Sequence, residues 1–310
     1  MQNENQTLVT EIFLLGFQNL HNLKIPLFSL LLLIYIMTVW ENVLIIVLVS
    51  SSRNLQSPMY FFLQQLALTD LLESSTVAPT LLNTVIHDGA TMSLAGCVSQ
   101  LYFFAVSERF ECFLLAVMSY DRYVAICNPL CYCSIMSHRV CVKLILITWA
   151  VNLFPIINSM NLITALRFCD QNVINHFFCD FYPLLELSCS NVLFVKIDLV
   201  IQTVPVVFCP FILITVSYMC IAHEILKIVS NTGRQKAFST CSSHLAVVSI
   251  FYGTFIAIYV VPPRKDSQTI SKVLSLLYTV VTPLINPIIY SWRSQDIKEA
   301  LKSKLLIEHP

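Results

Sequence analysis

Residues 26–50 read PLFSLLLLIYIMTVWENVLIIVLVS, and Glu41 is the only formally charged side chain among them. A helix needs about 20 predominantly apolar residues to cross the hydrocarbon core of a bilayer. This stretch is therefore long enough to cross a membrane as a single helix. Because residues 1–25 lack a basic segment followed by an apolar one, they do not resemble a cleaved signal peptide, and we expect residues 26–50 to act as their own insertion signal.

Six more stretches of comparable length and hydropathy follow along the chain. They are predicted to form helices at residues 59–86, 95–126, 140–162, 193–225, 237–261 and 269–292. The composition agrees, because 56% of the residues are hydrophobic and only 12% are charged, whereas soluble domains carry about 25% charged residues. We therefore predict an all-α membrane protein. Its parts are an extracellular N-terminus (1–25), a bundle of seven transmembrane helices (26–293) and a cytoplasmic C-terminus (294–310).

The loops on the two sides of the predicted bundle differ in their basic residues. More of the 18 lysines and arginines lie on the side of the C-terminus than on the side of the N-terminus, and basic loops generally stay in the cytoplasm. The chain has one Asn-x-Ser/Thr triplet, at Asn5, and glycosylation there requires an outer N-terminus. Both observations favour an N-terminus outside and a C-terminus inside. Acidic residues also number 18, so no net charge points to nucleic acid.

Four of the 12 cysteines lie outside in this topology, where disulfides persist. They are Cys97, Cys169, Cys179 and Cys189. Four cysteines allow three pairings, and the spacing does not choose among them. Zinc is a weaker interpretation, because the steps between these cysteines lack the short C-x2-C spacing of zinc sites.

Ionisable side chains inside the predicted helices point to function, because charge in hydrocarbon is costly. Asp70 and Glu111 are predicted to form a functional polar core, and Glu73 is predicted to lie one turn beyond Asp70 in contact with water. Glu108 and Glu111 share a helix face, with Arg109 as their near neighbour. The alternative is a mutually neutralised network that only specifies packing.

The third predicted helix ends in MSYDRYVAIC, residues 118–127, where it meets the cytoplasm. The adjacent Asp121 and Arg122 can hold each other until a helix moves, after which the guanidinium becomes a donor-rich group for an incoming partner. For an isolated pair, an interfacial arginine that extends to water would be the simpler explanation. The length of the run favours a switch.

This run resembles the corresponding segment of odorant receptors, the largest family of rhodopsin-like G-protein-coupled receptors. Four other stretches match that family in the expected order: LQSPMYFFL at 55–63, LTD at 68–70, KAFSTCSSHL at 236–245 and PLINPIIY at 283–290. Asn-Pro-x-x-Tyr is shared by rhodopsin-like receptors at large, whereas KAFSTCSSHL is specific to odorant receptors. The short outer loop at 262–271 is similar to that of the tetrapod-type class (class II). Together the matches cover nearly the whole chain.

The resemblance implies both a fold and a function. It adds a short amphipathic helix near residues 294–305, and it pairs Cys97 with Cys179 and Cys169 with Cys189. It also implies a plasma-membrane glycoprotein that serves olfaction and sensory transduction and is not an enzyme. Such a receptor binds a small volatile odorant and activates a stimulatory G protein of the olfactory type, which raises cyclic AMP.

The resemblance further assigns site residues, carried over from the matching motifs. The ligand pocket is expected from Phe104, Ala105, Glu108, Arg109, Gln202, Thr203, residues 251–254 with Tyr252, Tyr259 and Thr279. The switch and the G-protein contacts are expected from Asp121, Arg122, Tyr218, Lys236, Ser239, His244, Asn286, Pro287 and Tyr290. The polar core is expected from Asn42, Asp70 and Glu111. A sodium ion near Asp70 and Glu111 is considered there, and no other metal or cofactor is predicted.

Two departures from the family pattern bear on the ligand. The family usually has small or hydroxyl residues at the positions of Glu108 and Arg109, and glycine at the position of Glu41. As a hypothesis, the charged pair at the pocket floor favours ligands with an amine or a carboxylate alongside neutral odorants. Alternatively, the same departures destabilise the bundle.

Three other classes of protein are less consistent with the sequence. A rhodopsin-like receptor for another small molecule or a peptide shares the seven-helix plan, but KAFSTCSSHL and the short termini disfavour it. A transporter or channel should show broken helices in paired repeats or rings of charge. An intramembrane enzyme needs a nucleophile with its base or a metal site, and the seven histidines form no His-x-x-x-His pair.

Overall fold

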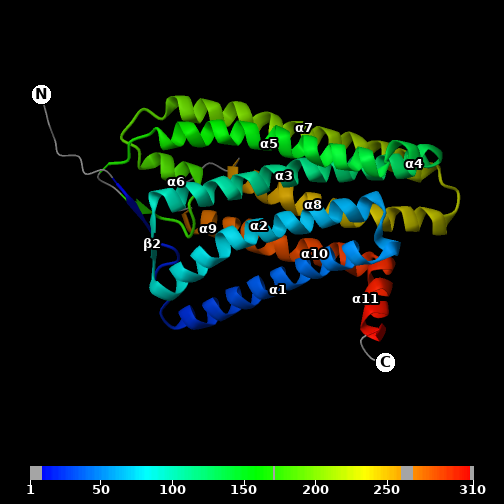
Figure 1. Cartoon of the computed structure of the whole chain (residues 1–310), viewed down its shortest axis with the longest axis horizontal. Coiled ribbons are helices and arrows are strands. Elements are labelled where there is room, and N and C mark those ends of the chain that lie inside the picture. The colour runs from blue at the N-terminus through cyan, green and yellow to red at the C-terminus, as the bar shows by residue number, and fades with distance from the viewer. Residues whose placement is uncertain (1–8, 170–171, 260–267, 308–310) are drawn as a thin grey trace, which may run out of the picture.

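The computed structural model describes residues 9–169, 172–259 and 268–307. Within those ranges, seven long helical segments run side by side as a bundle (Figure 1). They are α1 (Lys24–Ser51), α2 (Pro58–His87), α3 (Leu94–Cys127), α5 (His138–Thr164), α7 (Leu193–Lys227), α8 (Asn231–Tyr259) and the continuous series of α9 (Gln268–Leu276), the π-helical turn η4 (Leu277–Val281) and α10 (Thr282–Arg293). Each lies within a few residues of its predicted span except α8, which begins at Asn231 instead of 237.

Large apolar side chains point outward from the bundle. Phe154 on α5 is 77% exposed and Phe194 on α7 is 74% exposed, an arrangement that suits lipid and not water. By length and hydropathy alone, four helices in the described ranges qualify as membrane spans: His21–Ser51, His138–Thr164, Leu193–Lys227 and Ile270–Tyr290. Buried acidic side chains lie on α2 and α3, and α3 packs against α2, α5, α7 and α8. The acidic side chains of α2 and α3 therefore face the interior of the bundle.

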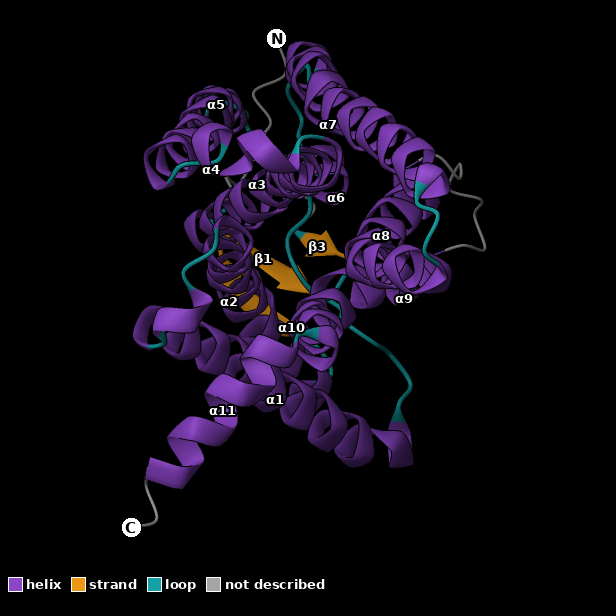
Figure 2. Cartoon of the chain, turned by 90° about the vertical axis from the view of Figure 1, so that its right-hand side faces the viewer, coloured by secondary structure: helices purple, strands orange, loops and turns teal. Residues whose placement is uncertain are grey.

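Three short strands form a sheet that the sequence analysis did not predict. β1 (Glu11–Leu14) lies between β2 (Ala90–Ser93), to which it is antiparallel, and β3 (Val173–Ile174), to which it is parallel. Figure 2 looks along the bundle and shows the strands beyond the ring of helices, towards its far end. Residues 11–14, which precede the first long helix, therefore lie at one end of the bundle.

The chain leaves β1 through Gly16, whose φ of +60° favours glycine. A Cβ at this position would lie 2.6 Å from the Thr84 Cβ on α2. Lys272 on α9 donates hydrogen bonds from Nζ to the Gly16 carbonyl (2.6 Å) and to Asn175 Oδ1 (2.7 Å). These contacts tie the N-terminal segment to α2, to α9 and to the loop that contains β3.

α11 (Gln295–Ile307) runs crosswise at the opposite end of the bundle (Figure 1). It buries Ile297 and Ala300, which lie three residues apart, while Lys298 and Glu299 are exposed. This is the amphipathic helix predicted near residues 294–305. The other described elements are short: η1 (His21–Leu23), η2 (Arg53–Leu55), η3 (Pro129–Cys131), α4 (Tyr132–Ile135) and α6 (Phe181–Glu186).

Candidate ligand pocket and polar switch

Two disulfides hold the loop between α5 and α7. Cys97 on the first turn of α3 is bonded to Cys179, 82 residues away, with 5.4 Å between their Cα atoms. Cys169 is bonded to Cys189, with 5.8 Å between their Cα atoms. These are the two pairs that the family resemblance implies, out of the three pairings that the spacing left open.

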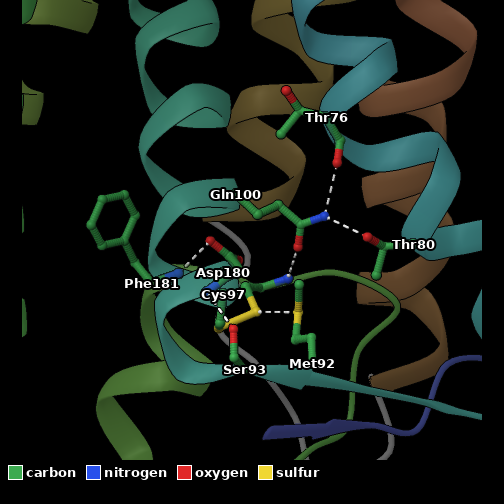
Figure 3. Close-up of a disulfide and its surroundings, with 10 residues drawn as sticks. Thr76, Thr80, Met92, Ser93, Cys97, Gln100, Asp180 and Phe181 are labelled. Carbon is green, nitrogen blue, oxygen red and sulfur yellow. Dashed lines mark hydrogen bonds between the residues drawn. A yellow bond between two sulfur atoms is a disulfide. The ribbon is translucent and has the colours of Figure 1, made fainter. Parts of the chain in front are cut away.

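Gln100 supports the first disulfide from the next turn of α3 (Figure 3). Its Oε1 accepts a hydrogen bond from the Cys179 backbone N–H (2.9 Å), and its Nε2 donates to the Thr76 carbonyl and to Thr80 Oγ1 (2.9 Å each). One side chain therefore joins α2, α3 and the loop between α5 and α7. Gln100 was not among the predicted site residues, although its place three residues after Cys97 puts both on one helix face.

A pocket lies between α3, α5 and α7, next to α6 and to one residue of α8. Its empty volume is about 990 Å³, part of which is open to the surroundings. It is lined by Ala105, Glu108, Arg109, Cys112, Ile156, Ser159, Asp180, Phe181, Tyr182, Leu199, Val200, Thr203, Val204, Val206, Val207 and Phe255. Small-molecule sites typically have such apolar walls with a few polar groups. Ala105, Glu108, Arg109 and Thr203 are among the predicted ligand residues.

The other predicted ligand residues with described side chains lie outside this lining, because aromatic rings fill the space near η4. Phe104 packs against Phe178 (ring centroids 5.0 Å apart) and Tyr278 (6.0 Å), and Phe251 packs against Tyr278 (5.9 Å). Tyr252 is buried, and Thr279 donates to the Ser275 carbonyl (2.8 Å). The pocket is therefore displaced towards α5. Gln202 does not line the pocket, but it accepts a hydrogen bond from Arg109, which does. The side chain of Tyr259 lies outside the described part of the chain.

Arg109 connects the pocket to a polar chain between α5 and α7. Its Nη1 donates to Gln202 Oε1 (3.1 Å), and Gln202 Nε2 donates to Asp198 Oδ2 (2.8 Å). Asp198 also accepts hydrogen bonds from Ser159 Oγ (2.6 Å) and Asn158 Nδ2 (3.0 Å). Asp198 was not singled out from the sequence, although an acid within a long apolar run is a detectable signal.

Asn286 on α10 forms the centre of the polar core. Its Nδ2 donates to Asp70 Oδ1 on α2 and to Glu111 Oε1 on α3, at 3.1 Å each. Asn42 lies elsewhere, because its Nδ2 donates to the Thr38 and Pro283 carbonyls (2.9 and 3.1 Å) and so joins α1 to α10. The polar core therefore links α2, α3 and α10. Asn42 forms a separate hydrogen bond to the backbone of α10.

The prediction for Glu73 was wrong. It was expected to contact water, but it is 1% exposed on α2, and neither carboxylate oxygen has a hydrogen-bond partner among the described residues. The reason is the crossing position of α2, which turns the face of Asp70 and the next turn towards α3. Glu73 therefore adds a further buried acid to the region around Asp70 and Glu111.

The Asp121–Arg122 pair is closed in this structure. Arg122 Nε donates to Asp121 Oδ2 (3.1 Å), and Tyr132 on α4 donates to the other carboxylate oxygen (2.8 Å). Burial and the nearby Asp121 carboxylate raise the pKa of Tyr132, so its hydroxyl remains a donor. The whole Asp121 side chain is buried.

A second contact joins α7 to α8 near the same end of the bundle. The Tyr218 hydroxyl and His244 Nδ1 are 2.6 Å apart, and His244 is fully buried. Tyr290 is buried on α10, which also contains Pro287. Lys236 and Ser239 lie on α8, and their side chains are outside the described part of the structure, as is Asn5.

The chain matches known proteins over nearly its full length. Residues 31–308 match the olfactory receptor family. Olfactory receptor 11L1 of Homo sapiens is 45% identical over 302 residues, which cover 97% of this chain and 94% of the relative. Olfactory receptor 5G3 of Homo sapiens is 44% identical over 305 residues (98% and 97%), and olfactory receptor 1468 of Rattus norvegicus is 44% identical over 301 residues (97% and 96%). The chain therefore belongs to the olfactory receptor family, and it is a seven-helix, multi-pass plasma-membrane receptor and not an enzyme.

Proposed function

We propose that the chain binds a small odorant in the pocket between α3, α5 and α7, activates a stimulatory G protein of the olfactory type and thereby raises cyclic AMP. One observation carries this proposal. The same helix, α3, lines the pocket with Glu108 and holds Arg122 in a closed pair nearer its other end. The 14 residue steps from Glu108 to Arg122 correspond to about 21 Å of helix. A shift of α3 or its neighbours therefore reaches both sites.

The contacts around Arg122 define the resting state of the proposed switch. Asp121 holds the guanidinium, and the Tyr218–His244 contact keeps α8 against α7. A ligand favours the open state only to the extent that it binds that state more tightly. Outward movement of α8 would break the Tyr218–His244 contact and expose Arg122 as a donor-rich group for the G protein.

The polar core lies between the pocket and Arg122. Its carboxylate oxygens are suitable ligands for a sodium ion. Within the described part of the chain, Asn286 is the one side-chain donor to Asp70 and Glu111, and Glu111 Oε2 has no hydrogen-bond partner there. Small hard cations prefer carboxylate and amide oxygens. Asp70 and Glu111 would hold the ion, and its positive charge would offset their repulsion in the closed state.

We propose that the sheet lies outside the cell and α11 lies in the cytoplasm. The Cys97–Cys179 disulfide lies at the end of the bundle that contains the sheet, and disulfides persist in oxidising compartments. α11 lies at the opposite end (Figure 1). The larger number of basic residues on the α11 side supports the same orientation.

The proposal is tested with the full chain in cells that carry a cyclic AMP reporter and the olfactory stimulatory G protein. A mixed odorant panel should give a concentration-dependent rise in cyclic AMP. Arg122→Ala, at equal surface expression, should abolish the rise because the group that meets the G protein is lost. A response that survives Arg122→Ala would contradict the proposed mechanism, and ion flux without G protein would contradict the proposed function.

A further inference from the structure

The pocket contains more acidic than basic side chains. Two carboxylates, Glu108 on α3 and Asp180 just before α6, line it together with one basic side chain, Arg109. The described residues contain no ion pair between Arg109 and Glu108, because the guanidinium turns to Gln202 and through it to Asp198. The charge of Arg109 acts on Glu108 as well as on Asp198, so a single cation serves the two lining carboxylates, and neither of them forms an ion pair among the described residues.

Asp180 is held rigidly in the pocket wall. It follows Cys179, whose disulfide and hydrogen bond to Gln100 tie it to α3 (Figure 3). Its Oδ1 accepts a hydrogen bond from the Phe181 backbone N–H (2.7 Å). Burial raises the pKa of Asp180, and the Phe181 N–H lowers it. Asp180 is thus a preorganised acceptor, and it needs no rearrangement to meet a ligand.

Glu108 and Asp180 line the same pocket, so their carboxylates repel each other when both are charged. Two like charges in an apolar pocket repel each other and so raise the free energy of the empty receptor. A cation bound between them removes that repulsion. The rest of the lining is apolar and includes Val204, Val207 and Phe255. A ligand that fits therefore has one positive group and a hydrocarbon body.

We infer that this pocket binds a small aliphatic amine as its ammonium ion, with the nitrogen between Glu108 and Asp180 and the hydrocarbon against Val204, Val207 and Phe255. The inference rests on the proposed odorant-receptor function and names the ligand class of the same pocket. An alkylammonium group is protonated at neutral pH, as the lysine side chain is. It donates charge-assisted hydrogen bonds that a neutral alcohol matches only weakly and a carboxylate does not offer.

The test compares three series of equal chain length from butyl to octyl: primary amines, alcohols and carboxylic acids. In the cyclic AMP assay the amines should activate the full-length receptor at concentrations about 10- to 100-fold lower than the alcohols, because hydrogen bonds to charged groups are the stronger ones. Glu108→Gln and Asp180→Asn should each remove most of that preference while the response to alcohols remains. Glu186→Gln is the matched control, since Glu186 is exposed on α6 next to the pocket loop and should leave the amine preference unchanged.

Binding is also measured without the G protein, as the rise in the Tm of the detergent-purified receptor with added amine. A rise in wild type that is lost in Glu108→Gln supports the inference even if coupling to cyclic AMP fails. Amines that neither activate the receptor nor raise its Tm overturn it, and a response to alcohols would then show that the receptor function stands without it. An amine preference that survives both Glu108→Gln and Asp180→Asn also overturns it.

Discussion

Tyr132 donates to Asp121 from outside α3, and this bond stabilises only the arrangement in which Asp121 is buried beside Arg122. Hydrogen bonds to charged groups contribute about 1.5–3 kcal/mol. Tyr132→Phe removes the hydroxyl and keeps the ring, so we expect the closed state to weaken and basal cyclic AMP to rise about two- to tenfold after correction for surface expression. Tyr120→Phe is the control, because Tyr120 is 41% exposed. Equal basal signals in the two variants would contradict this role.

Asn286 and Asn42 are both buried amides, but they leave different groups behind when removed. Asn286→Ala deprives two carboxylates of their shared donor, whereas Asn42→Ala deprives two neutral backbone carbonyls, those of Thr38 and Pro283. An unsatisfied buried polar group costs about 1–3 kcal/mol, and a charged group costs more than a neutral one. We therefore expect Asn286→Ala to lower the Tm of the purified receptor more than Asn42→Ala. The reverse order would show that the carboxylates are not ionised.

Single residues differ in how far the sequence predicts them. Asp121, Arg122 and the Cys97 pairing follow from motifs that a family resemblance carries over. Gln100 and Asp198 could not be chosen in the same way, because their roles depend on which helix faces them, and that is set by packing. The error for Glu73 has the same origin. The spacing of residues along one helix does not show which face of that helix is buried by a neighbouring helix.

Among the elements, β1 depends on contacts far away in sequence. The backbone N–H groups of Phe13 in β1 and of Leu15 just after it donate to the Asn172 and Ile174 carbonyls (2.7 and 2.9 Å). Lys272 is the side chain that ties this segment to α9. Lys272→Met removes the tie and keeps much of the hydrocarbon, so we expect the amides of 13–16 to exchange hydrogen about tenfold faster.

The measurement is hydrogen exchange followed by mass spectrometry on peptides that contain β1. Lys24→Met is the control, because the Lys24–Asp88 ion pair is exposed and such pairs contribute little. If the two substitutions have equal effects on β1, the Lys272 contacts do not hold the segment in place.

Helices and strands differ in predictability for a physical reason. In lipid the backbone of each spanning helix satisfies its own hydrogen bonds, so a long apolar run is enough to locate it. β1 has four residues, and its hydrogen bonds go to segments near residues 90 and 173. The sequence of residues 11–14 alone therefore does not predict which segments pair with β1. The start of α8 was also misplaced, because residues 231–236 are polar and lie beyond the apolar run.

At the scale of the whole molecule, the position of the pocket is set by packing and not by any one motif. The family resemblance places ligand residues on the third, fifth, sixth and seventh helices, and four of them line the pocket found here. The rings of Phe104, Phe178 and Tyr278 occupy the rest of that space. Side-chain volumes that fill a shared interior are a property of the assembled bundle, so the shift of the pocket towards α5 was not predictable.

The arrangement of the whole chain also makes a prediction about its two ends. β1 and α11 lie at opposite ends of the bundle, so the termini should lie in different compartments. In intact cells, deglycosylation should increase the mobility of the full chain on a gel, and Asn5→Gln should abolish that change. A tag after Pro310 should bind antibody only after the membrane is permeabilised. A tag that is accessible in intact cells, together with glycosylation at Asn5, would place both ends outside, and an odd number of crossings could not then be maintained.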